Sequence, residues 1–261
     1  MKKLIALVIC FMFLGIRHSF AETSQKHTWE VGTEISHITY KEPGVMKQKG
    51  VMSGILGSYT YYDNFMLKTE GRFSFGEVDY SSSSSGTMND IDDYILEIRG
   101  LGGRDFPVFK DSTIRPYFGI GYRYLNDDMS GRVTTTGAGG YERESNYIYS
   151  PIGVEFSKDL DNDFSFGATL EYDYFWEGKQ KSHLSDVPGY YDIENDQDEG
   201  YGWRGSLKFQ KESEKIDYII ESFVRYWNIK ESKTTTDPAG TSWVEPKNNS
   251  TEYGIKFTAR F

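Results

Sequence analysis

The sequence predicts an all-β fold: a transmembrane, antiparallel, up-and-down β-barrel of about ten strands, preceded by an N-terminal signal peptide. Three observations indicate it. Apolar and polar residues alternate with a period of two along ten segments, and such side chains lie on opposite faces of a strand. The connections alternate between short and long, as in barrels that insert into a membrane from one side. The chain contains 20 Tyr, 17 Phe and 27 Gly, which favours strands and turns over helices.

The first 21 residues have the pattern of a secretory signal peptide. Two lysines precede an uncharged apolar run over residues 4–16, and Ser19 and Ala21 are small residues placed three and one before a cleavage site. The apolar run is too short for a spanning helix, which needs about 20 residues. Cleavage is therefore expected before Glu22.

The mature chain, residues 22–261, is expected to be a single domain with an acidic balance. Removing the three basic residues of the signal peptide from 29 leaves 26, against 39 acidic residues. A basic surface for nucleic acid is therefore not expected. The only cysteine, Cys10, is lost with the signal peptide, which excludes disulfides and thiolate metal sites.

The first five predicted strands cover residues 28–40, 51–62, 65–78, 93–100 and 113–125. The third is the clearest, because Phe65, Leu67 and Phe73 alternate with charged or small residues. Asp63 and Asn64 predict a tight turn before it. The other four segments place these apolar residues on one face: Trp29, Val31, Ile35, Val51, Ile55, Tyr59, Tyr61, Tyr94, Leu96, Ile98, Phe118, Ile120, Tyr122 and Tyr124.

The last five predicted strands cover residues 146–156, 164–176, 201–209, 217–229 and 251–261. They continue the alternation, with these outward residues: Ile148, Ile152, Val154, Phe156, Phe166, Leu170, Tyr172, Tyr174, Trp203, Leu207, Phe209, Tyr218, Ile220, Val224 and Tyr226. The final segment has Tyr253, Ile255, Phe257 and Ala259 on one face and ends on Phe261, an aromatic carboxy-terminal residue.

The connections support a membrane barrel. Short turns join strands two to three, six to seven and eight to nine. Long polar loops are expected at residues 81–85, 134–140, 178–199 and 230–250, and residues 101–112 form a longer turn on the opposite side. An even strand count puts both termini in the periplasm. A soluble barrel would point its apolar face inward, whereas here the opposite face carries the charges.

The charged face of the strands predicts a lumen filled by ion pairs. Ten strands leave little more space than the eight whose interior side chains just fill, and an unpaired buried charge is costly. Paired charges would fix the barrel's shape; a narrow selective channel is the alternative, and a wide porin is not expected. The predicted network comprises Lys68, Glu70, Arg72, Glu97, Arg99, Arg115, Arg123, Glu155, Glu171, Asp173, Arg204, Lys208, Glu221, Arg225, Glu252, Lys256 and Arg260, with Glu30 and Glu34 on the same face.

Few residues are candidates for chemistry. The mature histidines are His27, His37 and His183, and only His183 lies in a predicted loop, near Ser185 and Asp186. A nucleophile and its base must reach hydrogen-bonding distance, which adjacency in a loop seldom provides. No catalytic residue, cofactor or metal site is predicted. The acidic stretch 192–199 lacks the glycine and closing Glu of a calcium loop, so a solvated loop is expected, with weak divalent binding as the alternative.

The signal peptide, the ten alternating segments and terminal Phe261 resemble bacterial outer-membrane β-barrels across the mature chain. Residues 115–124 are similar to a strand of the outer-membrane protein A type, and the ten-strand layout is similar to that of omptins, which are outer-membrane proteases. Omptins carry an Asp-x-Asp pair on the second outer loop, to which Asp90 and Asp92 correspond. They also carry an Asp-x-His pair on the fourth loop, but Lys181 stands two residues before His183.

The sequence thus predicts a non-enzymatic bacterial outer-membrane barrel with a salt-bridged lumen and a surface, adhesive or structural role. The alternatives are an omptin-like or lipid-modifying hydrolase and a narrow channel. Expected partners are outer-membrane lipid and lipopolysaccharide, the barrel-assembly machinery through the signal at Phe261, and an extracellular ligand of the loops. Nucleic acid is not expected as a partner.

Overall fold

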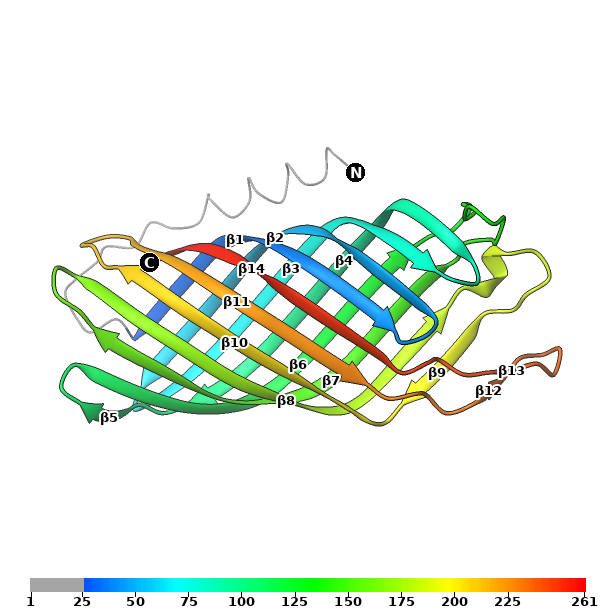
Figure 1. Cartoon of the computed structure of the whole chain (residues 1–261). Coiled ribbons are helices and arrows are strands. Elements are labelled where there is room, and N and C mark those ends of the chain that lie inside the picture. Colours follow the sequence, from blue (N-terminus) through cyan, green and yellow to red (C-terminus); the bar gives the residue numbers. More distant parts are fainter. Residues whose placement is uncertain (1–25) are drawn as a thin grey trace.

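The computed structural model describes residues 26–261, in which ten long strands close into an antiparallel barrel (Figure 1). Neighbouring strands pair around the ring, and β1 pairs with β14 to close it. The predicted fold is therefore confirmed; the expected signal peptide lies outside the described residues. The barrel strands are β1 (His27–Glu42), β2 (Met46–Asp63), β3 (Phe65–Ser82), β4 (Gly86–Gly103), β6 (Ser112–Asp128), β7 (Glu142–Asp159), β8 (Phe164–Ser182), β10 (Gly200–Lys211), β11 (Asp217–Ile229) and β14 (Asn248–Arg260).

The first and last strands meet at one end of the barrel. The Trp29 amide donates to the Phe261 carbonyl at 3.1 Å, and the Phe261 amide donates to the Trp29 carbonyl at 2.8 Å. Farther along the seam, Tyr253 lies opposite His37 on β1 and Val224 on β11. This end is the periplasmic one, because a barrel with an even strand number has both termini there. The opposite end, with β9 and β12 at the right of Figure 1, is extracellular.

The strands from β1 to β8, apart from short β5, are longer than the sequence predicted. They contain 16 to 19 residues, whereas a transmembrane β-strand needs about 9–11. The loop expected at residues 81–85 is a short turn: Ser81 and Ser82 continue β3, residues 83–85 form the turn, and β4 begins at Gly86. The barrel therefore extends beyond the outer face of the membrane.

Short additional elements lie at both ends of the barrel. The turn expected at residues 101–112 contains β5 (Phe106–Phe109), which pairs with β6 at the periplasmic end. The expected loop 178–199 contains the 3-10 turn η1 (Leu184–Asp186) and β9 (Ile193–Gln197), which pairs with β8. A small hairpin, β12 (Thr235–Thr236) and β13 (Ser242–Trp243), lies beside it. The acidic stretch 192–199 is therefore partly strand rather than a free loop.

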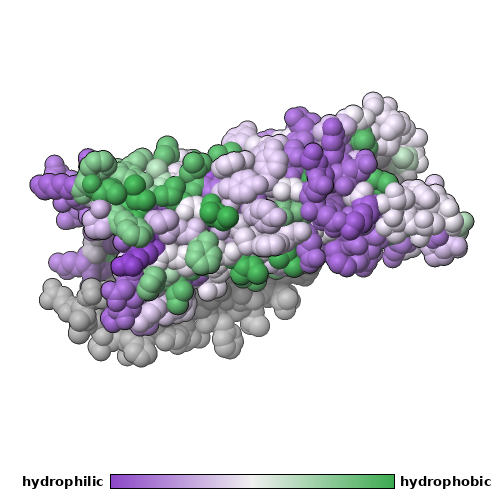
Figure 2. Space-filling view, turned by 90° about the horizontal axis from the view of Figure 1, so that it is seen from below, coloured by the Kyte–Doolittle hydropathy of each residue, from purple (hydrophilic) through white to green (hydrophobic). Residues whose placement is uncertain are grey.

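The outer surface is divided into an apolar and a charged zone. Leu67, Phe118 and Ile120 are 59%, 71% and 62% exposed, an arrangement expected where side chains face lipid. In Figure 2 the hydrophobic residues gather toward the periplasmic end and the middle, and hydrophilic residues separate them from the loops. Within residues 26–261, no helix is long and apolar enough to cross a membrane. The outward charged residues of the extracellular extension include Lys41, Lys47, Lys49, Glu77, Asp79, Asp92, Glu142, Glu144, Lys179 and Lys181.

The inner face changes character along the barrel. Near the extracellular end it carries two apolar clusters, which the sequence analysis did not anticipate. One is formed by Ile38, Tyr40, Met46, Met52, Val78, Met88, Ile91, Ile95, Leu125 and Met129. The other is formed by Tyr147, Tyr149, Phe175, Trp227 and Ile229. The extracellular half of the lumen therefore contains packed apolar clusters, beside buried polar side chains such as Gln48, Asp127 and Gln180.

Candidate functional site in the lumen and at the outer rim

A layer of interlocked ion pairs crosses the middle of the lumen. Arg72 of β3 contacts Glu34 of β1 at 2.9 Å and Glu97 of β4 at 2.8 Å. It also contacts Glu252 of β14 at 3.0 Å. Arg225 of β11 completes the group, at 2.9 Å from both Glu34 and Glu252. All five side chains are buried, so the layer joins strands from opposite sides of the barrel.

A second group continues this layer toward β8. The Arg204 Nε lies 2.7 Å from an Asp173 oxygen and 3.1 Å from a Glu171 oxygen. Arg99 binds Glu171 with both terminal nitrogens, at 2.7 and 2.8 Å. Two-point Arg–carboxylate contacts of this kind are among the strongest in proteins. The two groups share Glu97, which also contacts Arg204.

A glycine makes room for the hydroxyl that ties the ion pairs to the aromatic cluster. The Tyr149 hydroxyl donates to Glu97 at 2.6 Å. Its ring lies against Gly121 of β6, where an added Cβ would come within 2.3 Å of the ring. A larger residue than glycine at position 121 would therefore collide with the Tyr149 ring.

Below this layer lies a cavity of about 430 Å³, which we call the vestibule; the layer forms its roof. Lys256 pairs with Glu221 at 3.0 Å, and Lys208 pairs with Glu155 at 2.7 Å. Arg260 pairs with Glu30 at 2.7 Å near the periplasmic end. These side chains are about one fifth exposed, so water reaches them. The side chains of the roof are buried and are not reached by water.

The structure places every predicted network residue on the inner face, and all but one form ion pairs. Further contacts join Lys68 to Glu70 at 3.1 Å, Arg99 to Glu70 at 2.9 Å and Arg115 to Glu155 at 3.3 Å. Arg123 is the exception: it makes no ion pair among the described residues. Its guanidinium lies over the rings of Tyr147 and Trp227, 5.6 and 5.9 Å from their centroids. A cation over an aromatic face is stabilised by the ring's quadrupole, so this charge is held by the aromatic cluster.

A separate ion pair lies at the extracellular end of the lumen. Arg143 contacts Glu42 and Glu245, each at 2.6 Å, and all three are buried. Glu245 belongs to the segment between β13 and β14, so the contact fixes this segment over the mouth. Burial raises the pKa of Glu245 to about 7, against the opposing effect of Arg143. The sequence did not predict this group, because Glu42, Arg143 and Glu245 all lie outside the predicted strands.

The residues that match the omptin motif do not face the lumen. Asp90 and Asp92 are exposed on the outer face of β4, and the inward neighbour is Asp93. His183 follows β8 on the outer face, 2.7 Å from Glu144 of β7. An acid does therefore accompany His183, but it comes from the neighbouring strand. Partial burial opposes ionisation of Glu144, yet the hydrogen bond from His183 lowers its pKa.

The alternation of β7 could have revealed Glu144, because Glu142, Glu144 and Asn146 share the outward face of Ile148. The strand predicted from the sequence covers only residues 146–156 and therefore does not include Glu144. Phe261 ends the chain beside Trp29, at the periplasmic rim of the closing seam.

The chain matches a known protein family, and its fold is similar to that of solved outer-membrane proteins. The model of the autotransporter beta-domain matches residues 13–210. The structure is similar to the outer membrane protease OmpT from Escherichia coli, with a TM-score of 0.69, 12% identity, and coverage of 94% of this chain and 99% of that one. The transport unit of the autotransporter AIDA-I from Escherichia coli aligns with a TM-score of 0.47 and 8% identity over 97% of this chain and 96% of that one.

A search of the curated proteins finds no match. The family match covers most of the chain, and the fold is similar to that of the outer membrane protease OmpT. The chain belongs to the autotransporter beta-domain family and is a barrel of the bacterial outer membrane.

Proposed function

We propose that this protein is a closed, non-enzymatic surface barrel whose extracellular extension contacts the exterior in an adhesive or structural role. The observation that carries the proposal is the filled interior. The buried ion pairs around Arg72 cross the lumen, and apolar side chains such as Ile91 and Trp227 pack above them. A lumen filled in this way supports a scaffold for loops rather than a wide pore.

The positions of the acidic residues and the histidine also support a non-catalytic role. Activation of water by an omptin-type site needs a base beside carboxylates at the mouth of the barrel. Asp92 and His183 lie instead on the outer wall. Asp92 is on β4 and His183 directly follows β8, and two strands, β6 and β7, lie between β4 and β8. A hydrolase remains the alternative that the experiment below tests.

The extracellular loops present an aromatic surface. Tyr190 and Tyr191 are about half exposed, and Val244 is 40% exposed. The Tyr190 ring packs edge-on against Trp243, with centroids 6.1 Å apart, so two loops share this surface. Exposed aromatic side chains are enriched in protein interfaces because they bury much area at low entropic cost. We assign the contact with an extracellular ligand to this surface.

The outer wall offers contacts for the expected membrane partners. Lys41, Lys47 and Lys49 lie on the outward face of β1 and β2, beyond His37, and make no ion pair within residues 26–261. Lysines in this position suit the phosphates of lipopolysaccharide. The closing strand and Phe261 would contact the barrel-assembly machinery.

Hydrolysis assays separate the two classes of function. The protein, refolded in micelles that contain lipopolysaccharide, is incubated with a basic peptide and with phospholipid. We expect no turnover, and no difference between the native chain and His183→Ala. Cleavage that is lost in His183→Ala, or in Asp90→Ala combined with Asp92→Ala, would overturn the proposal.

Attachment of cells that display the barrel tests the adhesive role. We expect Tyr190→Ser combined with Tyr191→Ser to reduce attachment to a surface coated with extracellular glycoprotein. Val133→Ser is the matched control, because Val133 is an exposed apolar loop residue elsewhere. Equal attachment by all three proteins would contradict an adhesive role for this surface.

A further inference from the structure

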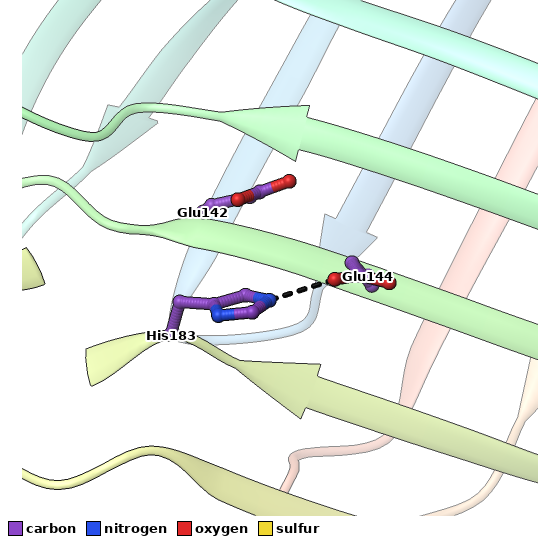
Figure 3. Close-up of side chains that lie close together, drawn as sticks. All are labelled: Glu142, Glu144 and His183. Carbon is purple, nitrogen blue, oxygen red and sulfur yellow. Dashed lines mark hydrogen bonds and ion pairs between the residues drawn. The ribbon is translucent and has the colours of Figure 1, made fainter. Parts of the chain in front are cut away.

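We propose that Glu142, Glu144 and His183 bind a divalent transition-metal ion on the outer surface, with Zn²⁺ the best chemical match. One donor atom from each residue lies within 4.8 Å of the other two (Figure 3). Glu142 and Glu144 are two apart on β7 and share its outward face. His183 directly follows β8, and its amide donates to the Glu142 carbonyl at 2.9 Å. Paired strands thus hold all three donors.

The donor set selects the metal. Zn²⁺ binds imidazole nitrogen and carboxylate oxygen at about 2.0–2.2 Å, whereas Ca²⁺ takes six to eight oxygen ligands. Tetrahedral coordination at those bond lengths puts donor atoms about 3.3 Å apart. His183 Nε2 and the Glu144 oxygen are 2.7 Å apart, so they need to separate by about half an ångström. Rotation of the Glu144 side chain would provide this separation, and the Glu142 carboxylate, within 4.8 Å of the other donors, would turn toward the ion.

Polar groups lie beside two of the ligands. The second ring nitrogen of His183 lies 3.8 Å from Asp192, whose other oxygen accepts a hydrogen bond from the Ser185 amide at 3.0 Å. This distance is too long for a hydrogen bond, but it leaves a carboxylate facing the free nitrogen, where metal sites usually have one. Asn126 donates to Glu142 at 2.6 Å and so restrains that carboxylate.

One neighbour opposes metal binding. The Lys181 ammonium lies 3.9 Å from the same Glu144 oxygen that contacts His183. A cation this close competes with a metal for the carboxylate. The site therefore offers variants with opposite expected effects, which a general loss of folding cannot produce.

Metal binding would also tie the loop that contains η1 to β7. His183 begins this loop, and Asp192 lies at its other end. The bound metal would join the loop to Glu142 and Glu144, so residues 184–191 should become more resistant to protease when the metal is present. This readout does not depend on any catalytic activity.

Calorimetric titration of tag-free protein, refolded in detergent without lipopolysaccharide, tests the proposal. We expect one Zn²⁺ per chain, no comparable binding of Ca²⁺, and protection of residues 184–191 from protease. Glu144→Gln and His183→Gln should each weaken Zn²⁺ binding at least tenfold, and Lys181→Ala should strengthen it severalfold. Glu77→Gln and His37→Gln are matched controls on the same outer wall and should bind normally.

Two results would overturn the proposal. One is the absence of saturable Zn²⁺ binding by the native chain. The other is native affinity in His183→Gln when electrophoresis without heating shows the barrel to be folded. Tighter binding in Lys181→Ala alongside loss in Glu144→Gln would establish the site even if one variant folds poorly.

Discussion

The periplasmic half of the lumen is lined by charged side chains around a cavity of about 430 Å³, whereas the extracellular half is packed with Met, Ile, Tyr and Trp. The charges of the vestibule are partly hydrated, so pairs such as Lys256–Glu221 need little compensation for desolvation. The roof, where Arg72 lies, is buried and its charges are each met by several partners. The lumen is therefore closed by ion pairs where it borders the hydrated vestibule, and largely by apolar packing nearer the extracellular end.

Removing the central arginine should have the largest effect. Arg72→Met would leave Glu34, Glu97 and Glu252 short of a partner, and loss of one member of a buried ion pair costs about 3–5 kcal/mol. Lys256→Met in the vestibule is the matched control and should cost about 0–1 kcal/mol, as for a hydrated pair. Urea unfolding of the barrel in lipid vesicles measures both. Equal losses would show that the two regions do not differ in the way described.

The apolar half can be tested in the same assay. Ile91 is fully buried in the larger apolar cluster, so Ile91→Ala should reduce the free energy of unfolding by about 2–5 kcal/mol. Val45→Ala, at an exposed turn of the same end, should change it by about 0.5 kcal/mol or less. A small loss for Ile91→Ala would mean that the extracellular half does not act as a packed core.

The boundary between lipid and water on the outer wall gives a third test. Phe73 lies in the apolar zone of β3, and Phe73→Arg should cost about 2–4 kcal/mol because the charge enters hydrocarbon. Glu77 is on the same face, four residues farther out, so Glu77→Arg should be almost neutral. The same unfolding measurement applies, and a neutral Phe73→Arg would place the membrane elsewhere.

A pH dependence of the extracellular ion pair gives a fourth test. The pKa of Glu245 is raised from an ordinary value near 4.5 to about 7. Between these two pH values, the folded state therefore holds a proton that the unfolded state has released. Its contribution to stability is complete below about pH 4.5 and is lost as the pH rises through about 7. The difference in unfolding free energy between the native chain and Glu245→Gln should therefore change between pH 5 and 8. A constant difference would contradict the raised pKa.

The strands could be predicted from the sequence because the outward face must be apolar wherever lipid covers it. This requirement explains the alternation of apolar and polar residues in β3 from Phe65 to Phe75. The alternation ends where the strand leaves the membrane. Ser81 and Ser82 were expected in a loop for this reason: past the membrane, alternation is no longer enforced. The apolar clusters were not predicted because the inward face was expected to be charged along its whole length. On β1 this face carries Glu34 within the membrane but Ile38 and Tyr40 beyond it.

The partners within the sites could be predicted only in kind. Charge balance on the inner face indicated ion pairs, but which acid meets Arg72 depends on how strands from opposite sides face one another. Arg123 was expected to pair with a carboxylate and lies over aromatic rings instead. Glu144 and His183 are 39 residues apart, and only the register of β7 with β8 brings them together.

Conductance in planar lipid bilayers tests the closed lumen most directly. The native protein should give no steady current, because the Arg72 layer and the apolar clusters fill the cross-section. Replacing Arg72, Glu97 and Arg123 together with neutral residues should make the folded fraction leaky or destabilise the barrel. Stable conductance of porin size from the native protein would contradict the account.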